Sequence, residues 1–404
     1  MSVTLVFPVE ADNQLILVIK YQKYLFVSTG ELATMQDLGR AIDCPVRIAY
    51  YWKPDVLAAM RGDTLPDPTV SVIIVNWNGK HLLTDCLESL RTQTFRDFEI
   101  ILVDNGSSDG SAEFVRMQYP EVRLIILQEN RGFAGGNNAG IKVSLGQYVA
   151  LLNNDTKADP DWLSSLIKTT ASDKHVGMWA SKILSYYSPS VIDNTGLLLY
   201  WDGLARGRGR LEVDGGQFDQ QREVLFPSGC AGLYRKSMLD EIGSFDEDFF
   251  AYADDVDLGF RGRLAGWGCA YVPGAVVYHK YSSSSSAYSP MKAFLVERNR
   301  IWVLLKYYPI ELVLLSPYFT FKRLVLSLYG ALTGRGASGK FAAQNSLIKA
   351  GLILLKAWCA ALKDIPGIMM WRREFRSKKR MGRQSFYRLH RRFSLSTAEI
   401  ALKE

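Results

Sequence analysis

Residues 70–79 read VSVIIVNWNG, a short apolar run with β-branched side chains that ends in a polar turn. Such a run is typical of a buried strand in a parallel sheet. The next segment places Leu82, Leu83, Cys86, Leu87 and Leu90 on one helix face. Further strands are predicted at 98–103, 122–127 and 148–152, and further helices at 111–118 and 139–145. This alternation predicts an α/β fold with a Rossmann-like, mostly parallel sheet and flanking helices.

Polar clusters stand where three of the predicted strands end. Asn76, Trp77 and Asn78 follow the first strand, Asp104 and Asn105 follow the second, and 153–155 follow the fourth. In open α/β sheets, ligands bind beyond the carboxyl ends of the strands. Helix capping and turn formation use the same residue types. Two clusters in register at adjacent strand ends favour a ligand site.

A glycine- and asparagine-rich segment lies at 130–138 and contains Gly132, Gly136, Asn137 and Asn138. Glycines let a backbone approach a ligand closely, and a helix N-terminus favours anions. The segment is neither a dinucleotide fingerprint nor a P-loop. A flexible turn is the alternative interpretation.

Two groups of acidic residues are candidates for metal binding and for catalysis. Asp155 follows a buried strand and is a candidate ligand for a hard cation, with His279 as a second ligand. Asp254 and Asp255 lie among aromatic residues, where burial can tune a general base. The alternatives are a turn aspartate, a structural histidine and a solvated acidic helix start.

The net charge of +7 is unevenly distributed, because residues 371–392 contain ten basic residues and one acidic residue. Such a tail fits an anionic lipid surface or a nucleic acid, but the near-neutral remainder does not suggest a DNA-binding body. The five scattered cysteines predict a reduced compartment, and no signal peptide is recognisable. We therefore expect a cytoplasmic protein.

Three parts of the chain are expected. Residues 1–66 are predicted to form a small accessory unit, bounded by Pro66 and Pro68. Residues 70–290 carry the candidate site residues, and residues 291–404 are predicted to be helical and basic. Segments 15–27 and 46–52 resemble strands, and a short helix is expected near 35–42.

Taken in order, six segments resemble the family 2 glycosyltransferases of the GT-A fold, and most closely the bacterial rhamnosyltransferase-like branch. They are 72–79 (VIIVNWNG), 103–110 (VDNGSSDG), 132–138 (GFAGGNN), 151–155 (LLNND), 245–250 (FDEDFF) and 254–258 (DDVDL). The resemblance implies a nucleotide-sugar site that includes Asn76, Asn78, Asn105, Gly132, Gly136, Asn137 and Asn138.

The same resemblance implies a role for each key side chain. Trp77 would stack on the base, and Asp104 would accept a hydrogen bond from it. Asp155 matches the last acid of the family's metal-binding motif and His279 a histidine that joins the metal, which implies Mg²⁺ or Mn²⁺. Asn153 stands where that motif has its first acid. Asp255 matches the general base, and Asp254 is its partner, at a position where Glu is more common.

The implied reaction is a single inverting displacement that moves a sugar from a nucleotide-diphosphate donor to a glycan or lipid-linked acceptor in bacterial surface polysaccharide synthesis. The branch suggests dTDP-L-rhamnose as donor, and UDP-sugars remain open. The chain lacks the Q-x-x-R-W segment of processive synthases, so a single addition is expected. A nucleotidyltransferase is the alternative enzyme, and a non-catalytic binding module with this fold is a further alternative. No nucleic acid partner is expected.

The C-terminal third predicts a peripheral contact with the inner face of the cell membrane. In 347–362, Ile348, Leu352, Leu355, Cys359 and Leu362 share one helix face, and Lys349, Lys356 and Lys363 share another. This pattern is typical of a helix in a membrane interface, and the basic tail suits an anionic leaflet. Packing of this helix on the catalytic domain is the alternative. No spanning helix is expected, because Pro317 interrupts the apolar run at 312–321.

Overall fold

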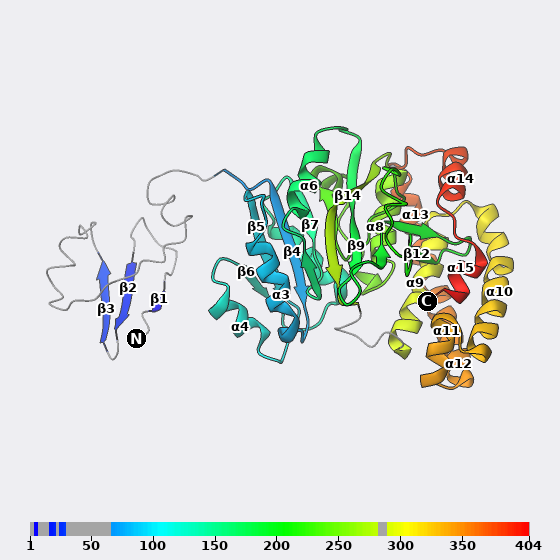
Figure 1. The fold of residues 1–404 in the computed structure, drawn as a ribbon, viewed down its shortest axis with the longest axis horizontal. Helices are drawn as coiled ribbons and strands as arrows, with labels where there is room; N and C mark the ends of the chain where they lie inside the picture. Colours follow the sequence, from blue (N-terminus) through cyan, green and yellow to red (C-terminus); the bar gives the residue numbers. More distant parts are fainter. Residues whose placement is uncertain (1–3, 7–15, 22–23, 30–65, 282–288, 404) are drawn as a thin grey trace. The chain divides into compact units, whose positions relative to one another are not determined.

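The computed structural model describes residues 4–6, 16–21, 24–29, 66–281 and 289–403, and Figure 1 shows the chain as a ribbon. The chain divides into two units, Met1–Leu65 and Pro66–Glu404. In the first unit, β1 (Thr4–Val6), β2 (Ile16–Tyr21) and β3 (Tyr24–Thr29) pair antiparallel in the order β1-β2-β3. The helix expected near 35–42 and the strand expected at 46–52 lie outside the described residues.

The second unit is built on a nine-stranded sheet within the described residues, with the order β6-β5-β4-β7-β13-β9-β14-β8 and with β10 paired to β9. The first four strands are parallel: β4 (Val70–Asn76), β5 (Phe98–Asp104), β6 (Arg123–Ile126) and β7 (Tyr148–Leu151). The predicted α/β sheet is therefore confirmed.

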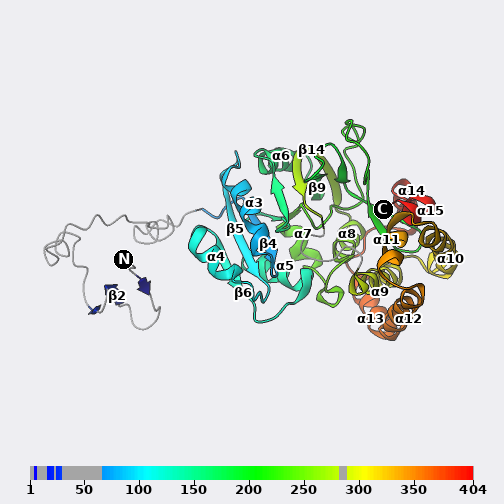
Figure 2. The ribbon, with the colours of Figure 1, turned by 60° about the horizontal axis from the view of Figure 1, so that its bottom comes forward.

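Alternate side chains of β4 enter two cores, because successive residues of a strand point to opposite faces of the sheet. Val72 and Ile74 pack with α3 (Lys80–Arg91), α4 (Ser111–Gln118) and α6 (Trp162–Thr170). Ile73 packs on the other face with α5 (Gly132–Val143), α7 (Lys236–Ile242) and α8 (Asp254–Leu264). Both faces of the sheet are thus covered by helices (Figures 1 and 2).

The glycine-rich segment is helical, whereas the sequence predicted a turn followed by a helix from about residue 139. Helix α5 begins at Gly132 and lies close against the sheet. A Cβ atom on Gly136 would come within 2.6 Å of Val75, and one on Gly140 within 2.6 Å of Ile73. The close approach of helix to strand accounts for these two glycines, and this tertiary packing overrides their low helix propensity.

The second half of the sheet is mixed and brings distant segments together. It contains β8 (Thr156–Ala158), β9 (Val176–Ser185), β10 (Ile192–Asn194), β13 (Gly232–Arg235) and β14 (Gly268–His279). Strand β13 runs antiparallel between β7 and β9, and β14 pairs antiparallel with β8. In the last pair His279 lies opposite Thr156, which brings the end of β14 to Asp155.

The C-terminal helices belong to the same compact unit as the sheet. They are α9 (Pro290–Tyr307), α10 (Ile310–Thr333), α11 (Gly336–Gln344), α12 (Leu347–Lys363), α13 (Ile365–Phe375), α14 (Arg383–Arg392) and α15 (Thr397–Leu402). Phe375, Phe386 and Phe393 enter a third core with Phe249 and Phe260. The tail also pairs with β11 (Leu197–Leu199), which itself pairs with β12 (Ala205–Gly207). Removal of the tail would therefore open a core.

The expectation that no helix reaches spanning length is wrong for α10, whose 24 residues are long and apolar enough to cross a membrane by length and composition. Pro317 does not end this helix. Its missing N–H leaves the carbonyl of Val313 without its usual partner, and the hydroxyl of Ser316 donates to that oxygen at 2.8 Å. The helix consequently continues through the proline.

Candidate active site

The ends of β4 and β5 bring the first two predicted clusters side by side, with Asn76 opposite Asp104 in the parallel register. The Asp104 carboxylate is buried, and its Oδ1 accepts a 2.8 Å hydrogen bond from the N–H of Ser107. Its Oδ2 has no partner among the described residues. Trp77 directly follows Asn76 in the chain and is 45% exposed. An open aromatic face and an unused carboxylate oxygen suit a nucleobase.

Asn76 and Asn78 serve mainly to hold this edge together. Asn76 Oδ1 accepts a 2.8 Å hydrogen bond from Asn154, and Asn78 Oδ1 accepts one of 2.8 Å from the N–H of Ser108. Asn154 joins β4 to the end of β7, and no local pattern in the sequence distinguishes it from its neighbour Asn153. The side-chain amide of Asn153 has no hydrogen bond to the described residues and is half-buried.

Asn105 and the asparagines predicted in the glycine-rich segment are held by hydrogen bonds within the protein. Asn105 Nδ2 donates to the carbonyl of Gly132 at 2.9 Å, and Asn137 Nδ2 donates to that of Phe133 at 2.8 Å. Asn138 donates to the carbonyl of Phe245 at 2.9 Å and accepts from its N–H at 2.9 Å. These contacts connect α5 to the segment before the acid pair.

The two predicted metal ligands meet, and a third residue supports them. His279 Nε2 lies 3.2 Å from Asp155 Oδ1, while His279 Nδ1 lies 2.7 Å from Asp193 Oδ2. Asp193 comes from β10 and pairs with Arg210. Burial alone would lower the pKa of His279, but Cys230 and the carboxylates of Asp155 and Asp193 around it hold that pKa well above its usual value. Sequence reasoning missed Asp193, because no local pattern connects it to His279.

This pair fits a divalent cation held partly by a substrate. No group of three or more His, Cys, Asp or Glu residues that could enclose a metal exists in the described part of the chain. Asp155 Oδ1 and His279 Nε2 can supply two ligands, and Asp193 on the other ring nitrogen would orient the imidazole, as carboxylates do behind metal-bound histidines. Mg²⁺ is commonly held this way, by one or two protein groups plus substrate phosphates and water.

The acid pair opens helix α8, with Asp254 buried and Asp255 half-buried. Asp255 Oδ2 accepts a 2.9 Å hydrogen bond from the N–H of Gly229, and Oδ1 accepts one of 2.9 Å from that of Val256. Asp254 Oδ2 has no partner among the described residues. Burial raises the pKa of Asp255, and burial together with the charge of Asp255 raises that of Asp254 more strongly.

The segment before the acid pair is strained. Phe250, Tyr252 and Ala253 have φ values of 64°, 68° and 60°, a region that residues other than glycine rarely adopt. The N–H of Ala251 donates to the carbonyl of Phe249 at 2.8 Å, which closes a γ-turn of the rare, strained hand at Phe250. Strain of this kind persists only where the surroundings hold it, and it is common at active sites.

Helix α9 supplies the restraint. The fully buried side chain of Asn299 donates to the carbonyls of Phe249, Ala251 and Tyr252 at 3.0, 2.9 and 2.7 Å. Its neighbour Arg298 donates to the carbonyls of Asp248 and Phe249. Two amide hydrogens shared among three carbonyls fix the loop that leads into Asp254. Sequence analysis singled out neither residue, since both lie beyond residues 70–290, which carry the predicted site residues.

Asp257, in the same motif, has a structural role. It is fully buried and pairs with Arg261 at 2.9 Å and with Lys306 at 3.2 Å. Burial alone would raise the pKa of Asp257, but the charges of Lys306 and Arg261 lower it below its usual value. Its charge is thus compensated, unlike that of Asp254.

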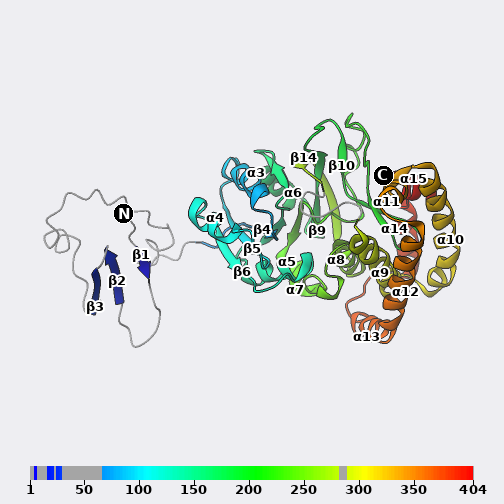
Figure 3. The ribbon, with the colours of Figure 1, turned by 90° about the horizontal axis from the view of Figure 1, so that it is seen from below.

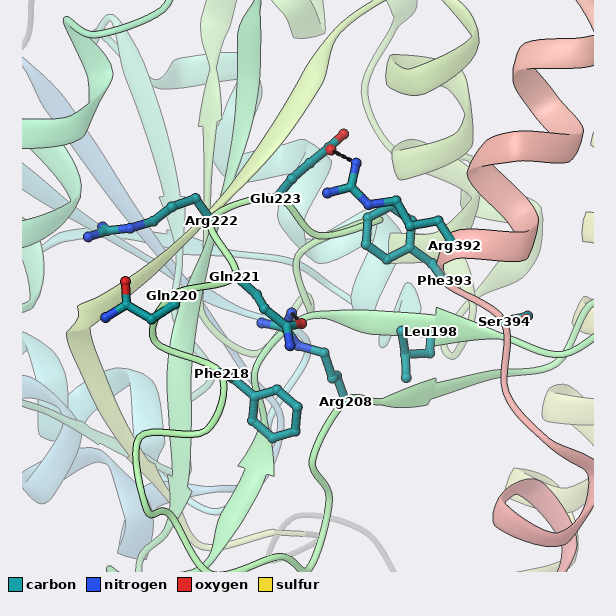
Figure 4. A pocket seen from close by; sticks show the side chains of 10 residues that line it. All are labelled: Leu198, Arg208, Phe218, Gln220, Gln221, Arg222, Glu223, Arg392, Phe393 and Ser394. Carbon is teal, nitrogen blue, oxygen red and sulfur yellow. Dashed lines mark hydrogen bonds and ion pairs between the residues drawn. The ribbon is translucent and has the colours of Figure 1, made fainter.

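A separate open pocket of about 650 Å³ lies between the tail and the segment 218–223 (Figure 4). It is lined mostly by polar side chains, among them Arg208, Gln221 and Arg222, and an ion pair between Arg392 and Glu223 crosses its rim. None of the predicted site residues lines it.

Comparison with known proteins gives a consistent family. The family described as Glycosyl transferase family 2 matches residues 71–243. The chain is 31% identical over 231 residues to uncharacterized protein y4gI of Sinorhizobium fredii, covering 54% of this chain and 25% of that relative. The chain therefore spans a quarter of that relative's length.

A second relative is covered almost completely. The chain is 30% identical over 277 residues to an N-acetylglucosaminyl-diphospho-decaprenol L-rhamnosyltransferase of Mycobacterium tuberculosis, covering 59% of this chain and 86% of that protein. Among solved structures, a crystal structure of GalNAc-T7 with UDP, GalNAc and Mn²⁺ superposes with a TM-score of 0.49 at 18% identity, over 61% of this chain and 49% of that one. On the sequence matches, the chain belongs to glycosyltransferase family 2.

Proposed function

We propose that this protein is an inverting, non-processive glycosyltransferase that moves a sugar from a nucleotide-diphosphate donor to a glycan or lipid-linked acceptor. One observation carries the proposal. The N–H of Gly229 holds the Asp255 carboxylate, while the carbonyl of the next residue, Cys230, accepts a 2.9 Å hydrogen bond from the N–H of Asn153. Consecutive residues therefore connect the candidate base to the end of β7, where Asp155 lies.

The donor would lie across the carboxyl ends of β4, β5 and β7. Trp77 offers its exposed ring to the base, and the unused Oδ2 of Asp104 accepts a hydrogen bond from a base N–H. This pairing would give a partner to a buried carboxylate oxygen that has none among the described residues. Asn153 and Asp155 both follow the end of β7, where the diphosphate would lie.

A divalent cation, Mg²⁺ or Mn²⁺, would be held by Asp155 and His279 and would neutralise charge on the departing diphosphate. Asp193 keeps the His279 ring oriented through Nδ1. Arg210, paired with Asp193, in turn supports that carboxylate.

Asp255 acts as the general base. Its raised pKa makes its carboxylate a stronger base than that of an exposed aspartate. It takes the proton of an acceptor hydroxyl as that oxygen bonds to the anomeric carbon. The bond from the anomeric carbon to the diphosphate oxygen breaks with its electron pair, and the nucleoside diphosphate leaves. A single displacement inverts the anomeric configuration.

L-rhamnose from dTDP-L-rhamnose is the proposed sugar, supported by the 30% identity to the mycobacterial L-rhamnosyltransferase, and the proposed setting is bacterial surface polysaccharide synthesis. That relative's name also supports a lipid-linked acceptor. A UDP-sugar donor is the alternative, and synthesis of the activated sugar by nucleotidyl transfer is a weaker one, since the polar turn after β4 lacks a glycine-rich basic signature.

We place the protein in the cytoplasm, peripheral to the inner face of the cell membrane. The lysine-bordered helix α12 and the basic segment 371–392 support this placement. Part of that segment is occupied, since Arg380 pairs with Glu241 and Arg383 with Glu311. The exposed Arg373, Arg376 and Lys378 are available to an anionic surface.

A donor screen by thermal shift followed by product analysis tests the reaction. A true donor stabilises the fold by about 2.7 kcal/mol at one hundred times its Kd, so it raises the melting temperature. We expect dTDP-L-rhamnose to do so with Mg²⁺ or Mn²⁺ present, and to be consumed to dTDP with an acceptor. Release of pyrophosphate from a sugar phosphate and a nucleoside triphosphate would instead identify a nucleotidyltransferase.

A further inference from the structure

Helix α10 has an inverted distribution of polar and apolar side chains. The side chains it buries include Ser316, Thr320 and Arg323, whereas most of its large apolar side chains point outward. Six of the exposed ones recur every three or four residues and form one stripe: Leu314, Tyr318, Phe321, Val325, Leu328 and Leu332. A helix on the surface of a water-soluble unit has the opposite arrangement.

Buried charges fix this orientation. Arg323 Nε lies 2.7 Å from Asp202 Oδ2, and another nitrogen of its guanidinium lies 3.0 Å from Glu297 Oε2. Arg300 completes the network with both acids, and Trp358 of α12 donates to Glu297 at 2.8 Å. Turning the apolar stripe inward would leave Asp202 and Glu297 buried beside fewer cations, which is costly. The outward apolar stripe is therefore built into the fold.

Helix α12 also exposes its large apolar side chains, but its buried side consists of alanines. Ala357 and Ala361 are its fully buried residues, and α12 packs against α9. The apolar face predicted from the sequence points outward, with Ile348, Leu352, Leu355 and Leu362 all exposed. Helices α10, α11 and α12 lie at the end of this unit opposite strand β6 (Figures 1 and 3).

The charge pattern selects the partner. The chain has 41 acidic residues among 404, yet none falls within 312–363. The same stretch contains Lys322, Arg323, Arg335, Lys340, Lys349, Lys356 and Lys363. A second copy of the chain on this face would bring lysines against lysines, because a two-fold interface pairs each patch with itself. An anionic surface with an apolar interior satisfies both the apolar stripes and the lysines.

We propose that the outer apolar face, meaning the exposed apolar side chains of α10 and α12, docks on an anionic lipid bilayer with α10 lying along the membrane surface. The proposal rests on the membrane placement above and adds the residues that touch lipid. Although α10 is long enough to span, its Arg323 is tied to Asp202 and Glu297, so the helix stays on the protein with only the outward stripe in lipid.

Vesicle flotation of the full chain tests the face. Wild-type protein should float with phosphatidylglycerol–phosphatidylcholine vesicles and much less with phosphatidylcholine alone. Phe321→Glu combined with Leu328→Glu should lower binding about tenfold or more, since two apolar side chains no longer enter lipid. The matched control is Met117→Glu with Ile126→Glu, whose exposed fractions of 66% and 52% equal those of Phe321 and Leu328. The control should float like wild type.

Three further measurements make the outcome decisive. Lys349→Glu with Lys356→Glu should reduce flotation and its salt sensitivity. A donor-induced rise in melting temperature, retained in every variant, would show that the fold and the donor site are intact, so failure of the reaction and failure of the docking face are distinguishable. Equal loss in the control pair, no preference for anionic vesicles, or conversion of a dimer to a monomer by the Phe321/Leu328 variant in sedimentation would overturn the proposal.

Discussion

The N–H of Gly229 donates a 2.9 Å hydrogen bond to Oδ2 of Asp255, across 26 residues of chain. Position 229 has no room for a side chain, because a Cβ atom there would lie 2.9 Å from the ring of Phe133. The bond orients the carboxylate and stabilises its charged form, while burial raises its pKa. The candidate base is thereby held by the N–H of Gly229, a backbone group that side-chain substitutions elsewhere in the chain do not remove.

Asp255→Asn should lower transfer by a factor of about 10² to 10⁴, the usual worth of a general base. Donor binding should largely survive, because the base acts on the acceptor hydroxyl. The control is Asp240→Asn, which makes the same change to an exposed carboxylate on α7 and should behave as wild type. Turnover of Asp255→Asn within a few-fold of wild type would remove Asp255 from the mechanism.

Removal of the metal by a chelator and the substitution Asp155→Ala should both impair use of the donor. We expect excess EDTA to suppress transfer, and Asp155→Ala to weaken donor affinity measured by calorimetry with Mg²⁺ or Mn²⁺. Asp193→Asn should weaken metal-dependent donor binding by about 10- to 100-fold, the usual effect of losing a residue that orients a metal ligand. Full activity in EDTA would mean that protein groups alone neutralise the diphosphate.

Gly132→Ala should disrupt the strained loop before the acid pair. A Cβ atom on Gly132 would lie 2.2 Å from the carbonyl oxygen of Phe250, and the φ of Gly132 is +72°. Gly110→Ala is the matched control, since its φ is +80° but its nearest neighbour, the Lys80 amine, is 3.7 Å away. The control should lose only about 1–2 kcal/mol of unfolding free energy and keep its kcat. Equal losses of stability and kcat in the two variants would show that the positive φ alone, and not the close approach of Phe250, causes the effect.

Asn299→Leu should release the same loop from the opposite side. The carbonyls of Ala251 and Tyr252 lose the Asn299 donor while the number of side-chain heavy atoms is unchanged, whereas the carbonyl of Phe249 keeps the donors Ala251 and Arg298. A buried carbonyl that loses its hydrogen bond costs about 1–3 kcal/mol. Since the loop positions the acid pair, kcat should fall while the affinity for donor remains. Asn299→Asp, which removes the amide donor, should fail in the same way, and urea unfolding would separate lost stability from a lost rate.

The acid pair predicts opposite effects of pH on rate and on stability. Because Asp255 must be ionised, kcat/KM should fall as pH drops through its raised pKa, which lies above the ordinary aspartate value. The folded protein binds the Asp254 proton more tightly than the unfolded chain, so unfolding free energy should decline as pH rises from the ordinary aspartate pKa toward the raised one. Asp254→Asn should reduce that decline to the smaller part that comes from the raised pKa of Asp255, and urea titrations across pH can measure the difference. Parallel curves of unfolding free energy against pH for wild type and Asp254→Asn would contradict this prediction.

Local sequence was sufficient for the parallel half of the sheet and for the family. The apolar β-branched run at 70–76 can be satisfied only between two covering layers, and the helix stripe from Leu82 to Leu90 has a single amphipathic face. The predicted boundaries at 111–118 match α4. Trp77 and Asp104 could be placed at one edge because parallel strands end on the same side.

What only the tertiary structure decided depends on contacts far apart in the chain. Asp193 meets His279, Gly229 meets Asp255 and Asn299 meets Tyr252 over separations of 86, 26 and 47 residues. No local periodicity encodes such pairs. The outward stripe of α10 is of the same kind: its apolar spacing alone suggests a core helix, and only the buried Arg323–Asp202 pair reveals which side faces the protein. Amphipathicity is a property of the sequence, but which face is buried depends on the partners that the fold supplies.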